Sequence, residues 1–374
     1  MLHIIAGCYK PNIAATLRLL ALVRGLTEAG ADYQLVFVYP NESQSIVDVQ
    51  SGIDNIKYLW EKHPIKNKYL KFLRSFWDVR SYVSKLPKGT PILLINSNDY
   101  LPVIIRYKKK VRLFVENTEH PEILKVFPSF LQSYYLKAIT QVDGVFVIST
   151  ALKGLYEQMG VKNVSLLNMV VDPERFADIQ KSKNREKYIA YCGSATNKKD
   201  GVDILIKAFA LFLEKNKDFK LYIIGKNPAF SDDQTNVNLM HSMGLDDSIV
   251  FTGEIPSEEI PQILIDADFL VLARPDSRQA QFGFPTKLGE YLLTGNPVVV
   301  TSVGDIPLFL KDGESAIVAR PGDEKSFASK MLWVAEHPEE AKEIGLRGRK
   351  VALSEFNGII EAKKIISKIE KREE

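Results

Sequence analysis

The chain has 374 residues, 45% of them hydrophobic, and this is more than one hydrophobic core usually serves. Its 49 basic and 46 acidic side chains leave a formal charge of +3, which argues against a dedicated nucleic-acid-binding protein and makes any phosphate recognition local. The two cysteines, Cys8 and Cys192, end apolar runs, as buried thiols do in a reducing compartment.

Apolar runs rich in β-branched and aromatic residues alternate with helical patterns along the whole chain. In the first half they predict strands at 2–7, 33–39, 91–96, 111–117 and 144–149. In the second half they predict strands at 187–193, 219–225, 248–253, 268–274 and 296–302. Strands that alternate with helices form parallel sheets covered on both faces, so the fold class is α/β with two sheets in tandem.

The polar and charged stretch at 170–187 is expected to link a first domain, 1–172, to a second domain, 187–356. The last stretch, 357–374, has apolar residues at helical spacing and could pack back on the first domain. The N-terminus, MLHIIAGCYKPN, has no basic leader, and no segment has transmembrane length. A cytoplasmic location is therefore expected, with a place at the inner membrane surface left open.

The stretch GFPTKLGEYLLTGNP predicts a helix over 285–294, because proline suits its start and Gly295 suits the position after its end. Lys287 and Glu290 share one face of this helix. A lysine at a positive helix end suggests an anion there, and a diphosphate held by Lys287 would bring an attached ribose near Glu290. The alternative is a surface ion pair between the two, worth about 0.3–0.5 kcal/mol.

A second pair of lysines lies in GSATNKKDGVDILIKAF, between a strand and a helix that is expected to begin near Asp200. Lys198 or Lys199 would project from the carboxyl edge of the second sheet, where open parallel sheets bind ligands. Two solvated lysines in a loop are the alternative, and the helix with Lys287 favours the phosphate site.

These blocks, together with FKLYIIG, SIVFTGEIPSEEI and DADFLVLARP, resemble in order and spacing the nucleotide-binding domain of family 4 retaining glycosyltransferases, over about residues 187–325. The resemblance implies the GT-B fold, with two Rossmann-like domains facing an interdomain cleft. It implies a nucleotide diphosphate sugar donor on the second domain and a glycan or lipid-linked glycan acceptor on the first. It also implies catalysis without a metal or another cofactor.

Carried over by position, the resemblance assigns the donor site residue by residue. The donor diphosphate would contact Lys199, Thr286 and Lys287, the two lysines acting as catalytic charge stabilisers. Glu290 would take the ribose hydroxyls, and the backbone at Gly253 and Ile255 would bracket the nucleobase.

Two positions depart from the family pattern. Phe282 stands where a glutamate directed at the donor sugar is common, and Ser194 stands where many members have arginine. Members with a Pro-x-Lys-x-x-Glu loop also lack that glutamate, so the chain resembles this subgroup. Arg274 and Gln281 are nearby candidates for the donor sugar, and Ser194 stays among the expected donor contacts.

In the first half, VENTEHPE follows a strand and carries Glu116, Glu119 and His120. Many similar sequences have a histidine here, near the reacting centre, so His120 is the first catalytic candidate, with Glu119 behind it. An exposed polar loop ahead of a helix is the alternative.

Other polar residues do not indicate a metal site. Asp266 and Asp268 form an Asp-x-Asp pair, but they lie at a helix-to-strand junction, which favours a helix end. His3, His63 and His241 have no second ligand at metal spacing.

The segment 65–83 combines apolar and basic side chains at helical spacing. The apolar set is Tyr69, Leu70, Leu73, Phe76 and Trp77, and the basic set is Lys66, Lys68, Lys71 and Arg74. Such a helix can contact a membrane surface or an acceptor, and RYKKKVR at 106–112 adds a second basic cluster. Burial of the aromatic face is the favoured alternative, because an α/β domain must cover its sheet.

The sequence thus indicates a retaining glycosyltransferase of polysaccharide or glycoconjugate synthesis. A nucleotide-sugar 2-epimerase of the same fold is one alternative. A catalytically inactive nucleotide-binding partner subunit is another, and Phe282 and Ser194 raise it.

Overall fold

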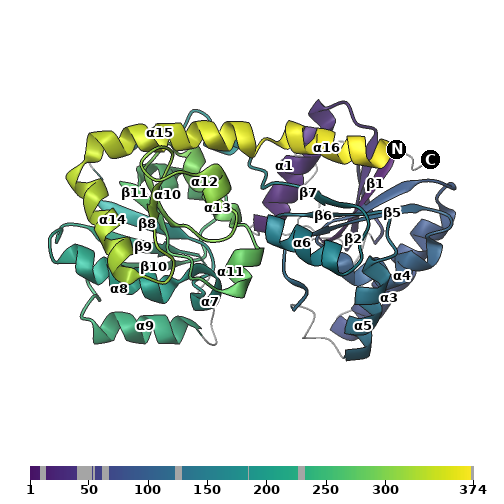
Figure 1. The fold of residues 1–374 in the computed structure, drawn as a ribbon, viewed down its shortest axis with the longest axis horizontal. Coiled ribbons are helices and arrows are strands. Elements are labelled where there is room, and N and C mark those ends of the chain that lie inside the picture. Colours follow the sequence, from purple (N-terminus) through teal and green to yellow (C-terminus); the bar gives the residue numbers. More distant parts are fainter. Residues whose placement is uncertain are drawn as a thin grey trace. The chain divides into compact units, whose positions relative to one another are not determined.

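The computed structural model describes residues 1–8, 14–39, 53, 55–60, 67–122, 129–183, 185–225 and 232–371. The chain divides into two compact units. Unit 1 comprises Met1–Val170 and Gly358–Glu374, and unit 2 comprises Val171–Asn357 (Figure 1). His63 and Lys66, named in the sequence analysis, lie outside the described residues, as do the side chains of Cys8, Lys68 and Tyr69.

The described part of unit 1 contains a seven-stranded parallel sheet in the order β3-β2-β1-β4-β5-β6-β7. The strands are β1 (Leu2–Cys8), β2 (Tyr33–Tyr39), β3 (Ile56–Tyr58), β4 (Pro91–Leu94), β5 (Arg112–Asn117), β6 (Gly144–Val147) and β7 (Val164–Leu166). Its helices are α1 (Ala14–Glu28), α3 (Lys68–Lys85), α4 (Leu101–Ile104), α5 (Ser129–Ile139), α6 (Thr150–Gln158) and α16 (Gly358–Glu370), with the 3-10 turns η1 (Asn98–Tyr100) and η2 (Ile105–Tyr107).

Unit 2, in its described residues, contains a six-stranded parallel sheet in the order β10-β9-β8-β11-β12-β13. The strands are β8 (Tyr188–Cys192), β9 (Lys220–Ile224), β10 (Ile249–Gly253), β11 (Phe269–Leu272), β12 (Val298–Thr301) and β13 (Ile317–Ala319). The longer helices are α8 (Val202–Leu213), α9 (Asp232–Ser242), α12 (Thr286–Leu293), α14 (Glu324–Glu336) and α15 (Pro338–Glu355). The shorter elements are η4 (Pro173–Phe176), α7 (Asn197–Asp200), α10 (Ile260–Asp266), α11 (Arg278–Phe282) and α13 (Ile306–Phe309).

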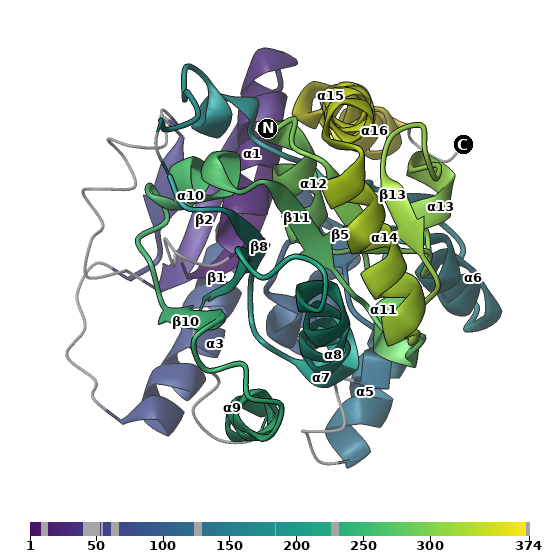
Figure 2. The same ribbon diagram turned by 90° about the vertical axis from the view of Figure 1, so that its left-hand side faces the viewer.

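Helices cover both faces of the sheet in unit 2. Figure 2 shows α8 and α14 side by side on one face, while α10 and α12 lie on the other. Every strand expected from the sequence is present, and the α/β class with two parallel sheets is confirmed. The strands β3, β7 and β13 were not predicted, because three residues are too few to show a period.

The last helix of the chain, α16, packs against the first, α1, within unit 1. Two glycines make the contact close, since a Cβ added at Gly25 would lie 2.2 Å from the backbone oxygen of Gly358. Leu22, Leu26 and Ile365 are fully buried in the same core. The C-terminal segment is thus a structural part of the first sheet's core.

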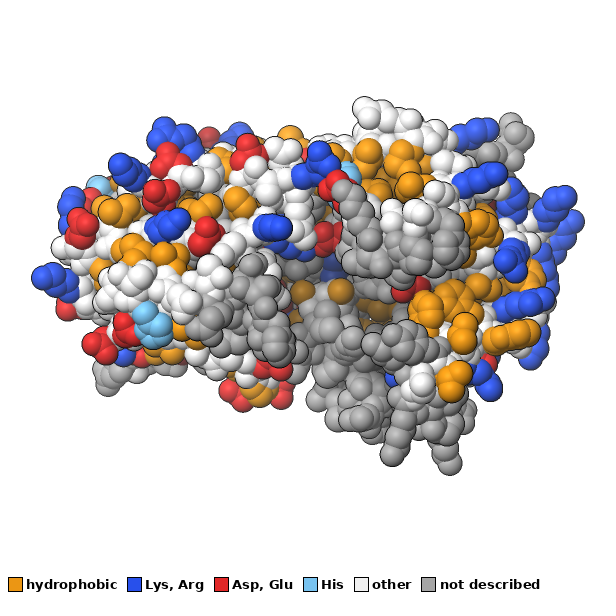
Figure 3. Space-filling view, turned by 90° about the horizontal axis from the view of Figure 1, so that it is seen from below, with side chains coloured by type: hydrophobic (Ala, Val, Ile, Leu, Met, Phe, Trp, Pro, Cys, Tyr) orange, Lys and Arg blue, Asp and Glu red, His pale blue; other side chains and the backbone are white. Residues whose placement is uncertain are grey.

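On α3, the side chains of Val79 and Val83 are buried, while Leu73 and Trp77 are exposed. Hydrophobic side chains gather beside Lys and Arg on the surface of unit 1 that Figure 3 shows. No helix in the described ranges is both long and apolar enough to span a membrane.

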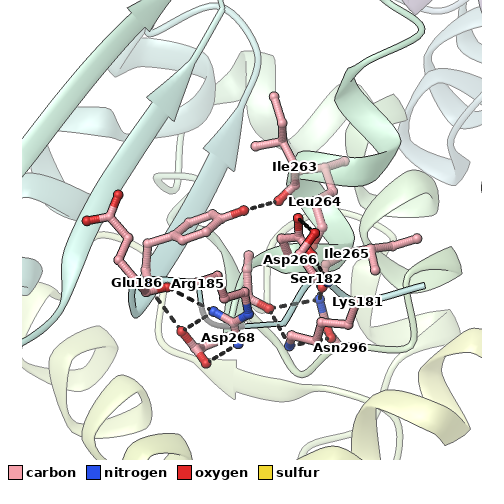
Figure 4. A network of polar contacts seen from close by, with 12 residues as sticks. Lys181, Ser182, Arg185, Glu186, Ile263, Leu264, Ile265, Asp266, Asp268 and Asn296 are labelled. Carbon is pink, nitrogen blue, oxygen red and sulfur yellow. Dashed lines mark hydrogen bonds and ion pairs between the residues drawn. The ribbon is translucent and has the colours of Figure 1, made fainter. Parts of the chain in front are cut away.

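The stretch expected to be a linker is fastened to unit 2 instead (Figure 4). The backbone N–H of Ser182 donates to Asp266 Oδ1 at 2.6 Å, and Arg185 donates to both carboxylate oxygens of Asp268, at 2.6 and 2.9 Å. Asp266 ends α10, as the sequence predicted. These carboxylates bind the stretch, which lies within unit 2, Val171–Asn357.

We expect Gly25→Ala to lower the free energy of unfolding by about 1–3 kcal/mol, because the added methyl group must push the α16 backbone away. Gly154→Ala in α6 is the matched control, since an added Cβ there meets nothing within 4 Å. This control should be neutral or stabilise by up to about 1 kcal/mol. Urea unfolding measures both, and equal effects would contradict the close helix contact.

Candidate functional site

Three segments of unit 2 converge where β8 ends: the turn after β8, α7 and the first turn of α12. Lys287 is the second residue of α12, and its Nζ donates to Asp200 Oδ2 at 2.7 Å and to the Tyr191 hydroxyl at 2.8 Å. The ammonium also lies 4.6 Å from the centre of the Tyr191 ring, a cation–π contact. Lys287 is thereby held at the carboxyl edge of the sheet, as expected for a ligand site of this fold.

Gly193 makes room for this lysine. Its φ is +146°, and an added Cβ would lie 2.3 Å from Lys287 Nζ. Glycine adopts such a φ without the steric cost that other residues meet. The glycine that ends the strand is therefore required by the ammonium above it.

Asp200, whose side chain is almost fully buried, carries the negative charge of the cluster. Burial alone would raise its pKa, but Lys287, and Arg274 behind it, outweigh burial and hold the pKa below the ordinary value. Burial lowers the pKa of Lys287, and Asp200 opposes that shift. Each charge of this pair keeps the other ionised in a place that would otherwise disfavour it.

Arg274 lies behind Asp200 and not at the surface. Its side chain is fully buried, with Nη2 donating to the Ala280 carbonyl at 3.1 Å and Nη1 placed 3.8 Å from Asp200 Oδ1. The expected direct contact with a donor sugar does not fit this burial. The guanidinium instead supports the carboxylate that holds Lys287.

Glu290, one turn further along α12, forms an ion pair with Arg175 from η4. Arg175 also donates to the Ser257 carbonyl at 2.9 Å and to its hydroxyl at 3.2 Å. Burial raises the pKa of Glu290, and the arginine opposes this. Lys287 and Glu290 thus have separate partners, and the simple surface pair considered from the sequence is not formed.

The other residues expected to bind the donor lie after β8, at the start of α12 and at the end of β10. Lys199 is half-buried in the last turn of α7, directly before Asp200, and Thr286 is the first residue of α12. Ser194 is exposed, and its carbonyl accepts from the Tyr191 hydroxyl at 2.6 Å. At the end of β10, Gly253 has a φ of +73° and its carbonyl accepts from the Gly225 N–H at 3.1 Å, while Ile255 is half-buried two residues on.

In unit 1, His120 and Glu119 are half-buried just after β5. The Glu122 N–H donates to His120 Nδ1 at 3.1 Å, so a neutral ring carries its proton on Nε2. The strand itself ends in a buried ion pair between Glu116 and Arg18 of α1, and Arg18 also donates to the Asn168 carbonyl at 3.2 Å. This pair ties α1 to β5 beneath the loop that carries His120.

Sequence reasoning missed Arg18, Arg175, Tyr191 and the role of Asp200. A lone arginine inside the apolar run TLRLLALV was a usable signal for Arg18, since such a charge needs a buried partner. Nothing local marked the other three, because their contacts with Lys287 or Glu290 join residues that are 87 to 115 positions apart. In the described ranges, no group of three or more His, Cys, Asp or Glu side chains could hold a metal ion.

Unit 2, which carries this site, is similar to a known protein family. Residues 186–337, within unit 2, match the family model described as glycosyl transferases group 1. Mannosylfructose-phosphate synthase of Agrobacterium fabrum is 25% identical over 320 residues, covering 79% of this chain and 67% of that protein. A GDP-mannose-dependent alpha-(1-6)-phosphatidylinositol monomannoside mannosyltransferase of Mycolicibacterium smegmatis is 29% identical over 199 residues, half of each chain.

Solved structures confirm the fold. Anabaena Alr3699/HepE, crystallised with UDP and glucose, has a TM-score of 0.76 at 16% identity and covers 99% of both chains. With the two parallel-sheet units, this likeness establishes the GT-B fold expected from the sequence.

We expect Asp200→Asn and Lys287→Met each to lower the free energy of unfolding by about 3–5 kcal/mol, because each leaves an uncompensated buried charge. The double variant should cost less than the sum of the two, by about 1–3 kcal/mol, since it removes both charges together. Urea unfolding of the four proteins measures this coupling. Strict additivity would mean that the two side chains do not interact in solution.

Proposed function

We propose that this protein is a family 4 retaining glycosyltransferase of the Pro-x-Lys-x-x-Glu subgroup. It moves a sugar from a nucleotide diphosphate sugar to a hydroxyl of a glycan or lipid-linked glycan acceptor. The observation that carries the proposal is the ammonium of Lys287, held by buried contacts at the start of α12. The family match over unit 2 and the glycosyltransferases among the relatives support it.

The donor diphosphate binds at Lys287. An ammonium has three N–H groups, and the contacts to Asp200 and Tyr191 leave the third for a phosphate oxygen. Its side chain keeps 15% of its surface exposed, which an incoming phosphate can reach. Backbone amides at Thr286 and the ammonium of Lys199 add positive potential at the same edge.

Glu290 binds the ribose through its second carboxylate oxygen, because Oε1 is engaged by Arg175. A carboxylate accepts hydrogen bonds only, which suits it to the two hydroxyl donors of a ribose. Main-chain groups at Gly253 and Ile255 contact the base, and Gln281, exposed on α11, is the remaining candidate for the donor sugar.

In the reaction, the acceptor oxygen bonds to the anomeric carbon on the face from which the diphosphate departs, so the configuration is retained. The breaking bond leaves negative charge on the diphosphate, and the pre-positioned Lys199 and Lys287 stabilise it without a metal. Because Nδ1 of His120 accepts a hydrogen bond, its Nε2–H acts as a donor in the neutral ring. The acceptor proton therefore goes to the departing phosphate oxygen.

A panel of radiolabelled nucleotide sugars tests the reaction class. Sugar transfer with nucleotide release, unchanged by EDTA, is the expected result. Sugar isomerisation alone would indicate the 2-epimerase, and tight nucleotide binding without turnover would indicate an inactive partner subunit. Thermal shifts with UDP, GDP and ADP identify the base first.

Lys287→Ala and Glu290→Ala should each lower kcat/KM by about 100-fold or more. Lys287 stabilises the negative charge that develops on the diphosphate, and Glu290 holds the ribose of the donor. Lys198→Ala is the matched control, because this lysine is exposed and precedes Lys199 on α7. Circular dichroism confirms folding of each variant. Wild-type turnover in both site variants would overturn the assignment of the site.

Arg175→Ala should weaken nucleotide diphosphate binding by about tenfold, because Glu290 then lacks the cation that orients it. The loss should be much smaller for the 2′-deoxy nucleotide, which lacks one hydroxyl that Glu290 binds. Arg185→Ala, from the same stretch but paired with Asp268, is the control. Isothermal titration measures the affinity of the wild type and of both variants for each nucleotide, and an unchanged ratio of ribo to deoxy affinity in Arg175→Ala would refute the role.

A further inference from the structure

The outer face of α3 exposes a cluster of large apolar side chains. Leu70, Leu73 and Trp77 are 56%, 59% and 67% exposed, and they lie at i, i+3 and i+7 on one side of the helix. With Phe72, these are four of the eleven exposed large hydrophobic residues in the part of the chain that the structure describes. Single exposed apolar residues are ordinary, but a contiguous stripe of this kind marks an interaction surface.

The opposite face of α3 already covers the sheet. Ser75, Val79 and Val83 are buried, and the Phe76 ring packs edge-on against Tyr100 at 5.4 Å. Burial was the favoured interpretation of the aromatic residues from the sequence; Phe76 is half-buried, and for Trp77 the interpretation is wrong. The helix therefore has two apolar faces, of which one is occupied by its own unit.

The chain around this surface is strongly basic. Between residues 70 and 110 there are nine Lys or Arg and two Asp, a net charge of +7, whereas the whole chain carries +3. Arg80 lies over the Trp77 ring at 5.5 Å and also donates to the Tyr107 hydroxyl, which connects α3 to the run Lys108–Lys110 after η2. Blue side chains flank the orange ones on this surface in Figure 3.

The exposed stripe begins near one edge of the sheet of unit 1. It starts at Leu70 in the first turn of α3 and continues to Trp77 in the middle of the helix, and α3 follows β3 and precedes β4 in a parallel sheet. The start of such a helix lies near the carboxyl edge of the sheet. That is the edge at which β5 delivers Glu119 and His120.

We propose that the exposed face of α3, formed by Leu70, Leu73, Trp77 and Arg80, docks on an anionic lipid surface. Leu and Trp side chains enter the boundary between head groups and acyl chains, and the surrounding Lys and Arg side chains contact lipid phosphates. A protein partner fits less well, because Lys is depleted where protein interfaces are buried.

Sedimentation of the full chain with vesicles tests this without any donor, so its outcome does not depend on the proposed reaction. We expect binding to phosphatidylcholine vesicles that contain phosphatidylglycerol, with a blue shift of tryptophan fluorescence. Binding should fall at high salt and on pure phosphatidylcholine, because the charge contribution is screened or absent. No binding to the anionic vesicles at low salt would overturn the proposal.

Two variant pairs locate the surface. Leu73→Glu should lower the vesicle partition coefficient at least about tenfold, whereas Leu308→Glu, at an equally exposed leucine of α13, should not. Arg80→Gln with Lys109→Gln should lower the vesicle partition coefficient by a similar factor, whereas Lys311→Gln with Arg320→Gln, both exposed in unit 2, should not.

Equal losses in test and control pairs would refute docking through α3. Self-association that Leu73→Glu abolishes, without vesicle binding, would identify a dimer contact and overturn the lipid proposal.

Discussion

The ion pair between Lys287 and Asp200 organises the candidate site of unit 2. The carboxylate is buried between two cations, so it is stable only while Lys287 and Arg274 remain in place. Because Asp200 ends α7 and Lys287 lies in the first turn of α12, their contact holds two helices at the end of β8. Gly193 and Tyr191 both serve this contact. Gly193 leaves space for the ammonium of Lys287, and the Tyr191 hydroxyl accepts a hydrogen bond from it.

A second charged contact completes the site from outside the expected second domain. Arg175 belongs to the stretch that the sequence identified as a linker, yet it reaches Glu290 and Ser257. The following residues are fastened by Asp266 and Asp268, so the stretch is held along unit 2 at several points. The connection between the sheets is thus part of the candidate site, and Arg175 contacts the carboxylate proposed for the ribose.

Unit 1 has its own buried ion pair, Arg18 with Glu116, at the carboxyl end of β5. It joins α1 to the central part of the sheet, and α16 covers α1 from the other end of the chain. The loop with His120 therefore follows a strand that an ion pair joins to α1. On the same unit, α3 leaves apolar and basic side chains uncovered, which the packing of the sheet does not require.

The sequence by itself determined the parallel α/β architecture and the positions of most strands, and it singled out Lys287 and Glu290 as site candidates, because hydrophobic period, glycine and proline positions and local motifs act over short distances along the chain. The tertiary structure alone decided which partner each charge has. Lys287 meets Asp200 from 87 residues away, and Glu290 meets Arg175 from 115 residues away. It also decided that Arg274 is buried and Trp77 exposed, since burial depends on what packs against a side chain and not on the side chain's own polarity.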